Sequence, residues 1–394
     1  NGNKQFLIPV YQRYYSWDIE QCKRLWNDIV DMQKKNKQGH FVGSIVNIAE
    51  QAMPTGVQKY MIIDGQQRMT TLTLLLIALR DYSIDHPKDT SINFLRIDNM
   101  LLKNEYENGD ERYKLLLTEN DRDILINLIE RKPISENTVS RLLTNYSFFV
   151  EQIEKNELMP AEIYESIGKL QIVNITLDRA VDDAQAIFES LNSTGKELSE
   201  SDLIRNYILM GLENNEQRYI YEHFWRPMEL MFDYEKQGTI MDKFFRDYLT
   251  MKLIRIPKMD KVYEEFKLYH INCEFSSVAD LCEDLLKYAK YYTDMVFVRN
   301  SNHEIKNLYA DVKDLRMEVA FPFLLKVHND CSEKVITEEN LIEILKICIS
   351  YVFRRSICDI PTNSLNKTFA TLRNEIKQDD YMNSIKAFFV LRDD

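Results

Sequence analysis

One short stretch constrains the fold of this chain more than any other: a β-branched run that ends in Asp-Gly and passes directly into a long apolar run. The first run is Tyr60-Met61-Ile62-Ile63, and its composition is typical of a strand. Asp64-Gly65 follows as a tight turn. Residues 69–79 are apolar on all sides, which predicts a buried helix. The segment is therefore expected to be strand, tight turn and helix.

Further runs extend this first part of the chain. Residues 41–48 predict a strand that forms a hairpin with residues 60–63 across a loop at Pro54-Thr55-Gly56. Residues 170–177 alternate as a third strand would. The sequence between the predicted helix and this third strand, about 83–169, is polar, with apolar residues at three- and four-residue spacing. We therefore expect a helical insertion there. Two further helices are expected, over 182–191 and 199–210.

The second half is helical in pattern almost throughout. A chain of 394 residues, 45% of them hydrophobic, is too long for one compact unit, so two domains are expected. We predict an α+β domain over residues 1–212, with a small mixed sheet, and an all-α domain over 213–394. Helices are expected in the second domain at 242–253, 261–268, 278–298, 314–327, 338–353 and 365–372.

The cysteines and the apolar runs bear on location. The six cysteines lie far apart and form no CxxC pair, which favours a reducing compartment without zinc or disulfides. No apolar run approaches the roughly 20 residues that span a bilayer. We therefore expect a cytoplasmic protein with no membrane segment. The chain begins at Asn1 without Met or a signal-peptide pattern, so we expect that Asn1 is not the natural N-terminus.

Charge is uneven along the chain. The net charge is −12, which argues against a protein that simply coats DNA, since such binding needs many Lys and Arg contacts to phosphate. Residues 1–82 nevertheless hold ten Lys and Arg against seven Asp and Glu, a net of +3, which leaves −15 for the remainder. If an anion binds, we expect it to bind in this early part.

The turn after the second strand is the first candidate site. A strand that turns straight into a helix presents free backbone N–H groups and the positive end of the helix dipole, both of which favour a phosphate. Arg68 can clamp a phosphate, Asp64 can hold a divalent cation, and Gln66 and Gln67 can donate to phosphate oxygens or orient water. The structural alternative is a turn in which Asp64 caps the helix and Arg68 neutralises it.

Two other polar clusters accompany this turn. Residues 8–17 form an extended, aromatic segment in which Tyr11, Gln12 and Arg13 could stack a base or clamp a phosphate. Its aromatic residues could equally cover the core. Residues 188–199 place polar groups around a turn at Gly195, where Asn192 is the candidate ligand contact. We expect the three clusters to line one cleft.

Several familiar sites are absent from the sequence. There is no GxxxxGK[ST], GxGxxG, HExxH or GxSxG pattern, and the six histidines have no metal-ligand spacing. Residues 213–394 also lack a nucleophile–base pattern. We therefore expect no catalytic centre in the second half.

Three motifs together carry a family resemblance. They are Phe6 to Arg13 with Trp17, Ile63 to Arg68 with Thr70-Thr71-Leu72, and Phe188 to Gly195 with Asp202-Leu203-Ile204. In this order, over residues 6–210, they resemble the N-terminal domain of GmrSD-type restriction proteins. The resemblance implies a ParB- or sulfiredoxin-like fold and a restriction or phage-defence role.

The resemblance also implies an activity. In the family, the Asp-Gly-Gln-Gln-Arg motif is associated with hydrolysis of nucleoside triphosphates that licenses attack on modified foreign DNA. In this sequence the resemblance implies catalytic roles for Asp64, Gln66, Gln67 and Arg68, with Asp64 as the Mg²⁺ ligand. The residues expected to contact the nucleotide, GTP or ATP, are Tyr11, Gln12, Arg13, Gly65, Thr70, Asn192 and Gly195.

The family commonly continues through a helical region into an HNH nuclease domain. The last histidine here is His328 and no such motif follows it, so we expect sensing and nucleotide hydrolysis rather than DNA cutting. Two other hypotheses stay open: a DNA-nicking nuclease that uses the same pocket, and a non-catalytic module that docks a partner through its helical half. A homo-oligomer is compatible with each of them.

Overall fold

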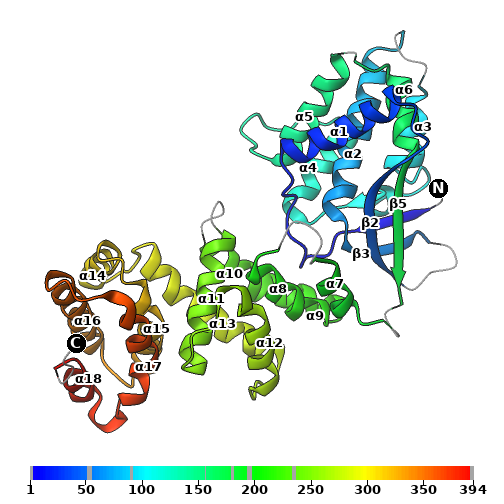
Figure 1. Ribbon diagram of the computed structural model, residues 1–394. Helices are drawn as coiled ribbons and strands as arrows, with labels where there is room; N and C mark the ends of the chain where they lie inside the picture. Colours follow the sequence, from blue (N-terminus) through cyan, green and yellow to red (C-terminus); the bar gives the residue numbers. More distant parts are fainter. Residues whose placement is uncertain are drawn as a thin grey trace. The chain divides into compact units, whose positions relative to one another are not determined.

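The computed structural model describes residues 3–50, 56–88, 92–155, 157–178, 182–192, 198–232 and 237–390. The chain divides into two compact units, Asn1–Glu197 and Leu198–Asp394 (Figure 1). The first contains the sheet, and the described part of the second is helical. This arrangement confirms the predicted α+β part followed by an all-α part.

A small mixed sheet forms one layer of the first unit. Its strands, in the spatial order β4-β1-β3-β2-β5, are β1 (Lys4–Leu7), β2 (His40–Ala49), β3 (Gln58–Asp64), β4 (Leu115–Leu116) and β5 (Leu170–Leu177). Strands β2 and β3 are antiparallel, whereas β1 with β3 and β2 with β5 are parallel. The three predicted strands are all present. The two short strands, β1 and β4, were not predicted.

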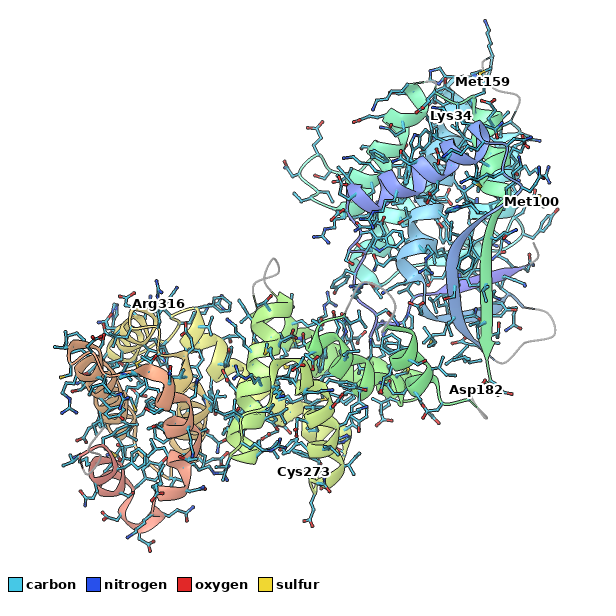
Figure 2. The ribbon with its side chains drawn as sticks, viewed as in Figure 1. Lys34, Met100, Met159, Asp182, Cys273 and Arg316 are labelled. Atoms are coloured by element: carbon cyan, nitrogen blue, oxygen red, sulfur yellow. The ribbon has the colours of Figure 1, made fainter. Side chains whose placement is uncertain are left out.

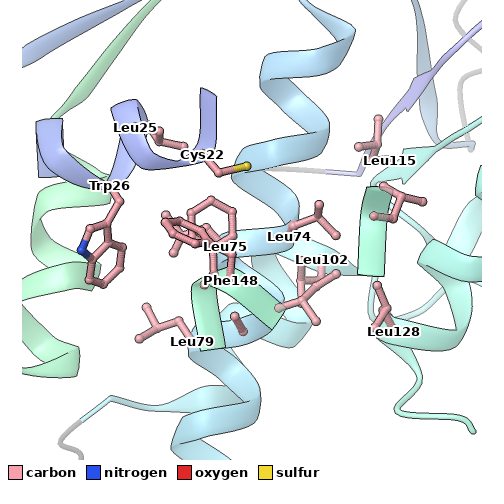
Figure 3. Packing of buried hydrophobic residues seen from close by; sticks show 14 of the residues in the cluster. Cys22, Leu25, Trp26, Leu74, Leu75, Leu79, Leu102, Leu115, Leu128 and Phe148 are labelled. Atoms are coloured by element: carbon pink, nitrogen blue, oxygen red, sulfur yellow. The ribbon is translucent and has the colours of Figure 1, made fainter. Parts of the chain in front are cut away.

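Helix α2 (Gln66–Asp85) is the core element that follows β3. Leu74, Leu75 and Leu79 are fully buried in the cluster that fills the unit. Figure 3 shows Trp26 of α1 (Ile19–Lys34) and Phe148 of α5 (Arg141–Glu154) in the same cluster. The helix buries residues around its circumference, as its all-apolar sequence predicts.

The insertion between α2 and β5 is mostly helical, as expected. Its elements are α3 (Phe94–Ile97), η1 (Asp98–Leu102), η2 (Gly109–Arg112), β4, α4 (Glu119–Ile129), α5 and α6 (Pro160–Gly168). The difference is β4, which pairs with β1 and makes the insertion part of the sheet. A two-residue strand has no alternating pattern to reveal it.

A buried arginine ties the insertion to α2. Arg80 is only 2% exposed, and its guanidinium donates to the carbonyls of Leu128 (3.0 Å) and Ile129 (2.6 Å) at the end of α4. It also pairs with Asp81 and Asp98. A buried charge is tolerated only when it is paired and hydrogen-bonded, and Arg80 meets both conditions.

The described part of the second unit contains helices and no strand. The α-helices are α8 (Glu200–Met210), α9 (Asn214–Ile220), α10 (Arg226–Met231), α11 (Gln237–Leu253), α12 (Val262–Asn272), α13 (Val278–Val296), α14 (His303–Asp314), α15 (Phe321–Ser332), α16 (Glu338–Ile357), α17 (Leu365–Leu372) and α18 (Tyr381–Val390). Short helical turns, η3 (Tyr221–Trp225), η4 (Met259–Lys261), η5 (Glu318–Ala320), η6 (Thr362–Ser364), η7 (Arg373–Glu375) and η8 (Gln378–Asp380), join them. In the residues described, none of these helices is long and apolar enough to cross a bilayer.

Helix α8 belongs to the second unit, so the division falls before it and not after residue 212, where the sequence prediction placed it. The backbone N–H of Ser201 donates to Asp242 Oδ1 (2.7 Å) on α11. Glu200 Oε2 accepts from the backbone N–H of Tyr263 (2.6 Å) on α12. Such side-chain contacts between helices far apart in sequence leave no mark on the local pattern.

Candidate functional site

The turn between β3 and α2 is held in a conformation that suits only glycine. Gly65 has φ of +93° and forms the N-cap of α2. A Cβ atom placed on Gly65 would lie 2.9 Å from both the Ser44 carbonyl oxygen and Ile45 Cγ1 of β2. The turn therefore packs its backbone directly against the neighbouring strand, and no other residue fits.

The first turn of α2 carries no side-chain cap. Gly65 offers no capping oxygen, and no described residue accepts a hydrogen bond from the backbone N–H groups of Gln66, Gln67 or Arg68. Asp64 is half-buried, and no described residue donates to its carboxylate or pairs with it. The structural alternative, in which Asp64 caps the helix and Arg68 neutralises it, is therefore not what the structure shows.

Arg68 lies against β2. Its Nη1 donates to the Ser44 carbonyl. Gly43 has φ of +110°, and a Cβ there would lie 2.9 Å from the Arg68 guanidinium carbon. Within the described residues the remaining guanidinium N–H groups have no acceptor, so they can bind an anion. Sequence reasoning missed Gly43, although a glycine inside a strand often marks a close approach of another group.

The aromatic segment (residues 8–17) meets this turn, as predicted. Gln12 Nε2 donates to the Ile63 carbonyl (2.8 Å), and Gln66 Nε2 donates to Gln12 Oε1 (3.0 Å). Gln12 is 6% and Gln66 7% exposed. The two amides form a buried chain of hydrogen bonds that fixes the segment beside the last residues of β3.

Gln67 holds the same segment further along. Its Oε1 accepts from the backbone N–H groups of Ser16 (2.7 Å) and Trp17 (3.2 Å), and its Nε2 donates to the Tyr14 carbonyl (3.1 Å). Both acceptor positions of the amide oxygen are thus occupied. Gln67, which the sequence analysis placed among the catalytic residues, is a positioning residue in this geometry.

The insertion supplies further contacts that the sequence did not reveal. The Tyr15 hydroxyl lies 2.6 Å from Thr71 Oγ1 and accepts from Asn145 Nδ2 (2.9 Å). Asp121 Oδ2 accepts from the Tyr15 backbone N–H (2.7 Å). Burial raises the pKa of the Tyr15 hydroxyl above its ordinary value, so it stays protonated. Asn145 and Asp121 have no local motif that could have identified them.

With this geometry in place, comparison with known families identifies the first part of the chain. The model of the family described as GmrSD restriction endonuclease, N-terminal domain, matches residues 1–209. The chain belongs to this family. The match confirms the predicted resemblance and places the chain among the proteins of restriction systems. None of the curated proteins compared matches it.

Besides Gln12 and Gly65, two more of the predicted nucleotide contacts of this GmrSD-family chain are buried. Tyr11 is 1% and Thr70 2% exposed. Their side chains pack inside the first unit and have almost no surface exposed to solvent. Arg13 is partly exposed, and the Gln12 amide fixes the segment just before it.

The third cluster is described only in part. Helix α7 (Ala184–Asn192) packs against β3, the strand that ends in Asp64. Before it, the Asp182 side chain accepts from the backbone N–H of Asp178 (2.7 Å) just after β5. Figure 2 shows Asp182 near the end of this strand. The Asn192 side chain and Gly195 lie outside the described residues.

Gln67→Leu tests the positioning role. We expect it to leave two backbone N–H groups and one carbonyl of the aromatic segment without partners, at a cost of about 2–4 kcal/mol of unfolding free energy. The matched control is Gln38→Leu, which makes the same change at an exposed amide with no described side-chain partner and should cost less than about 0.5 kcal/mol. Urea unfolding followed by Trp fluorescence measures both. Equal stability of the two variants would contradict the role.

Proposed function

We propose that the first unit is a Mg²⁺-dependent nucleoside triphosphatase, the sensing and licensing part of a restriction system directed at modified foreign DNA. The observation that carries the proposal is the start of α2. There the N–H groups of residues 66–68 and the Asp64 carboxylate have no partner among the described residues. A helix N-terminus without a side-chain cap favours a phosphate.

Arg68 supports phosphate binding at the same place. Contact with Ser44 positions its guanidinium over β2, and the N–H groups not used in that contact remain as donors. A guanidinium held in this way can donate two parallel hydrogen bonds to a phosphate. Helix dipole, backbone donors and arginine would then act on one anion.

Asp64 fits the donor set that Mg²⁺ uses. This ion is usually bound through one or two carboxylates, with phosphate oxygens and water as its other ligands. Within the described residues no three His, Cys, Asp or Glu side chains gather around one point, so the nucleotide would supply the remaining ligands. When bound, the ion supplies charge neutralisation on the β- and γ-phosphates.

The aromatic segment would complete the site. Gln12 and Gln66 tie it to the end of β3, and Gln67 ties it to α2. Arg13 follows Gln12 directly, so its backbone starts from a fixed point beside the turn. We assign Arg13 the role of closing over the phosphates, where a second guanidinium would stabilise transferring charge.

The charge balance favours a nucleotide over duplex DNA as the ligand of this turn. Residues 1–82 carry a net charge of +3, whereas the whole chain carries −12. A compact anion can be bound by one local cluster, but a duplex needs a basic surface over several turns. Nicking of DNA in the same pocket is therefore the weaker alternative.

The test is phosphate release from each of the four ribonucleoside triphosphates, with and without Mg²⁺ and with modified or unmodified DNA. We expect hydrolysis of GTP or ATP that requires Mg²⁺ and increases with modified DNA. A supercoiled plasmid in the same reactions reports nicking. Nicking without phosphate release would favour the nuclease alternative. If neither activity is detected, the non-catalytic interaction module is the better hypothesis.

A further inference from the structure

The second unit contains a cavity of about 360 Å³ whose lining is partly charged. Helix α11 supplies five of its thirteen lining residues, and α13, α15, α17, the turn η5 and Ile256 supply the others. Helices α11, α13 and α15 pack against one another (Figure 1). A volume near the lower end of the range for ligand pockets, about 300–1,000 Å³, suits a small molecule and excludes a folded partner.

Two cations lie on the α11 side of the cavity. Lys243 and Arg246 are three residues apart, which places them on one face of the helix. Arg246 Nε donates to the Pro257 carbonyl (3.1 Å), a contact that positions the side chain and leaves its terminal nitrogens free of any described acceptor. Lys243 is exposed and its ammonium group forms no described hydrogen bond or ion pair.

Two carboxyl groups also line the cavity, and one of them, Asp247, interacts electrostatically with both cations without a direct ion pair. No described ion pair joins Asp247 or Glu318 to Lys243 or Arg246, although all four side chains face the same space. Charges that served only to stabilise the unit would be expected to pair with one another. Without a direct ion pair, the donor groups of the two cations stay available to a ligand.

Asp247 is distinctive in its surroundings. It lies among Lys243, Arg246, Glu318 and Tyr292, and its carboxylate accepts from the Tyr292 hydroxyl. It keeps some exposed surface, but desolvation by the surrounding side chains raises its pKa to about 7. Near neutral pH, part of the negative charge beside the cations is therefore removed by protonation.

The cavity also has an apolar part to its lining. Tyr292 and Phe321 are buried aromatic side chains, and Ile240, Ile256 and Val296 extend the wall. The Tyr292 and Phe321 ring centroids are 5.3 Å apart with an interplanar angle of 83°. Such a wall can pack against a flat, apolar body.

We propose that this cavity binds a small organic anion, in which a phosphate, carboxylate or sulfonate group contacts Lys243 and Arg246 and a flat ring packs against the partly exposed side chains of Ile240, Ile256 and Val296. Two cations that form no described ion pair, together with an apolar wall in one cavity of this size, are the features that carry it. The site lies in the second unit and does not depend on the hydrolysis proposed for the first.

Calorimetric titration of the full chain tests the site. The probes are phenyl phosphate, benzoate and benzenesulfonate, with inorganic phosphate and phenol to supply the charged group and the ring alone. We expect at least one aromatic anion to bind more tightly than either fragment. The preferred probe then distinguishes phosphate from carboxylate ligands. Absence of binding by every aromatic anion at millimolar concentration would overturn the proposal.

Charge variants test which residues bind the probe. Lys243→Gln and Arg246→Gln should each weaken binding by about 10-fold or more, since each removes a charged donor. The matched control is Lys306→Gln, which removes an exposed lysine of α14 that has no described ion-pair partner. If all three variants bind the probe equally, the anion is not bound by this cavity. Thermal unfolding verifies that each variant is folded.

The pH dependence gives a second readout. Asp247 is protonated below a pH of about 7 and charged above it, so binding of benzenesulfonate, which does not titrate there, should weaken as pH rises through that value. The Asp247→Asn variant still accepts from Tyr292. It should bind benzenesulfonate equally tightly below and above pH 7. Benzenesulfonate affinity that is flat with pH in the native chain would contradict the arrangement.

Discussion

Asp64→Asn will lower the rate of nucleoside triphosphate hydrolysis by about 100- to 1,000-fold while leaving unfolding unchanged. The carboxylate stands at the end of β3 with no described donor or cation beside it, so the fold gains nothing from its charge. A cation-bound triphosphate needs that charge. Phosphate release and thermal unfolding, measured on the same sample, separate the two effects.

The matched control for this change is Asp123→Asn. Asp123 is an exposed aspartate of α4, in the same unit, with no described partner, so the variant makes the same charge change away from the turn. Its turnover should equal that of the native chain. If Asp64→Asn and Asp123→Asn hydrolyse the triphosphate equally well, the assignment of Asp64 fails.

Arg68→Gln should behave differently from Asp64→Asn, because Arg68 also has a structural contact. Loss of the hydrogen bond to Ser44 should cost about 1 kcal/mol of stability. Loss of the phosphate donor should reduce turnover by a factor similar to that for Asp64. Reduced stability with normal turnover would confine Arg68 to the structural role.

The sequence predicted those parts of the site that are determined by residues close together in the chain. Asp64-Gly65 between a β-branched run and an apolar run requires a turn, and the structure places that turn where the pattern does. The aromatic segment was also identified, because a glutamine and an arginine among tyrosines are difficult to explain as packing alone. Both features can be read within about ten consecutive residues.

What the sequence could not supply are contacts between residues far apart in the chain. Gln67 was assigned to catalysis because an amide beside a phosphate site can donate, but its oxygen is occupied by the backbone of Ser16 and Trp17. Asn145 holds the same segment through Tyr15 and the Trp17 carbonyl from a helix of the insertion. Residue type alone does not distinguish an amide that binds ligand from one that orders backbone.

The second large effect that we expect is on stability, when glycines of the first unit are replaced by alanine. Three glycines differ in backbone strain and in steric contact, so their variants distinguish these two costs. Gly65 combines φ of +93° with a Cβ position 2.9 Å from a backbone oxygen. Gly109 has φ of +58° and open space around it. Gly168, the last residue of α6, has an ordinary φ and also lies in open space. The alanine variants therefore differ by one cost at a time: none at Gly168, backbone strain at Gly109, and backbone strain with a steric clash at Gly65.

We expect Gly168→Ala to stabilise the first unit by about 0.5–1 kcal/mol, since alanine is the better helix former. Gly109→Ala should destabilise it by about 1–2 kcal/mol, the cost of the left-handed conformation. Gly65→Ala should cost about 2–5 kcal/mol, because the clash with Ser44 adds to the same strain. Hydrogen exchange of the α2 amides reports the stability of this unit without contribution from the second. If Gly65→Ala lowers the unfolding free energy no more than Gly109→Ala does, the turn can move away from β2. The phosphate site could then not depend on a fixed geometry of this turn.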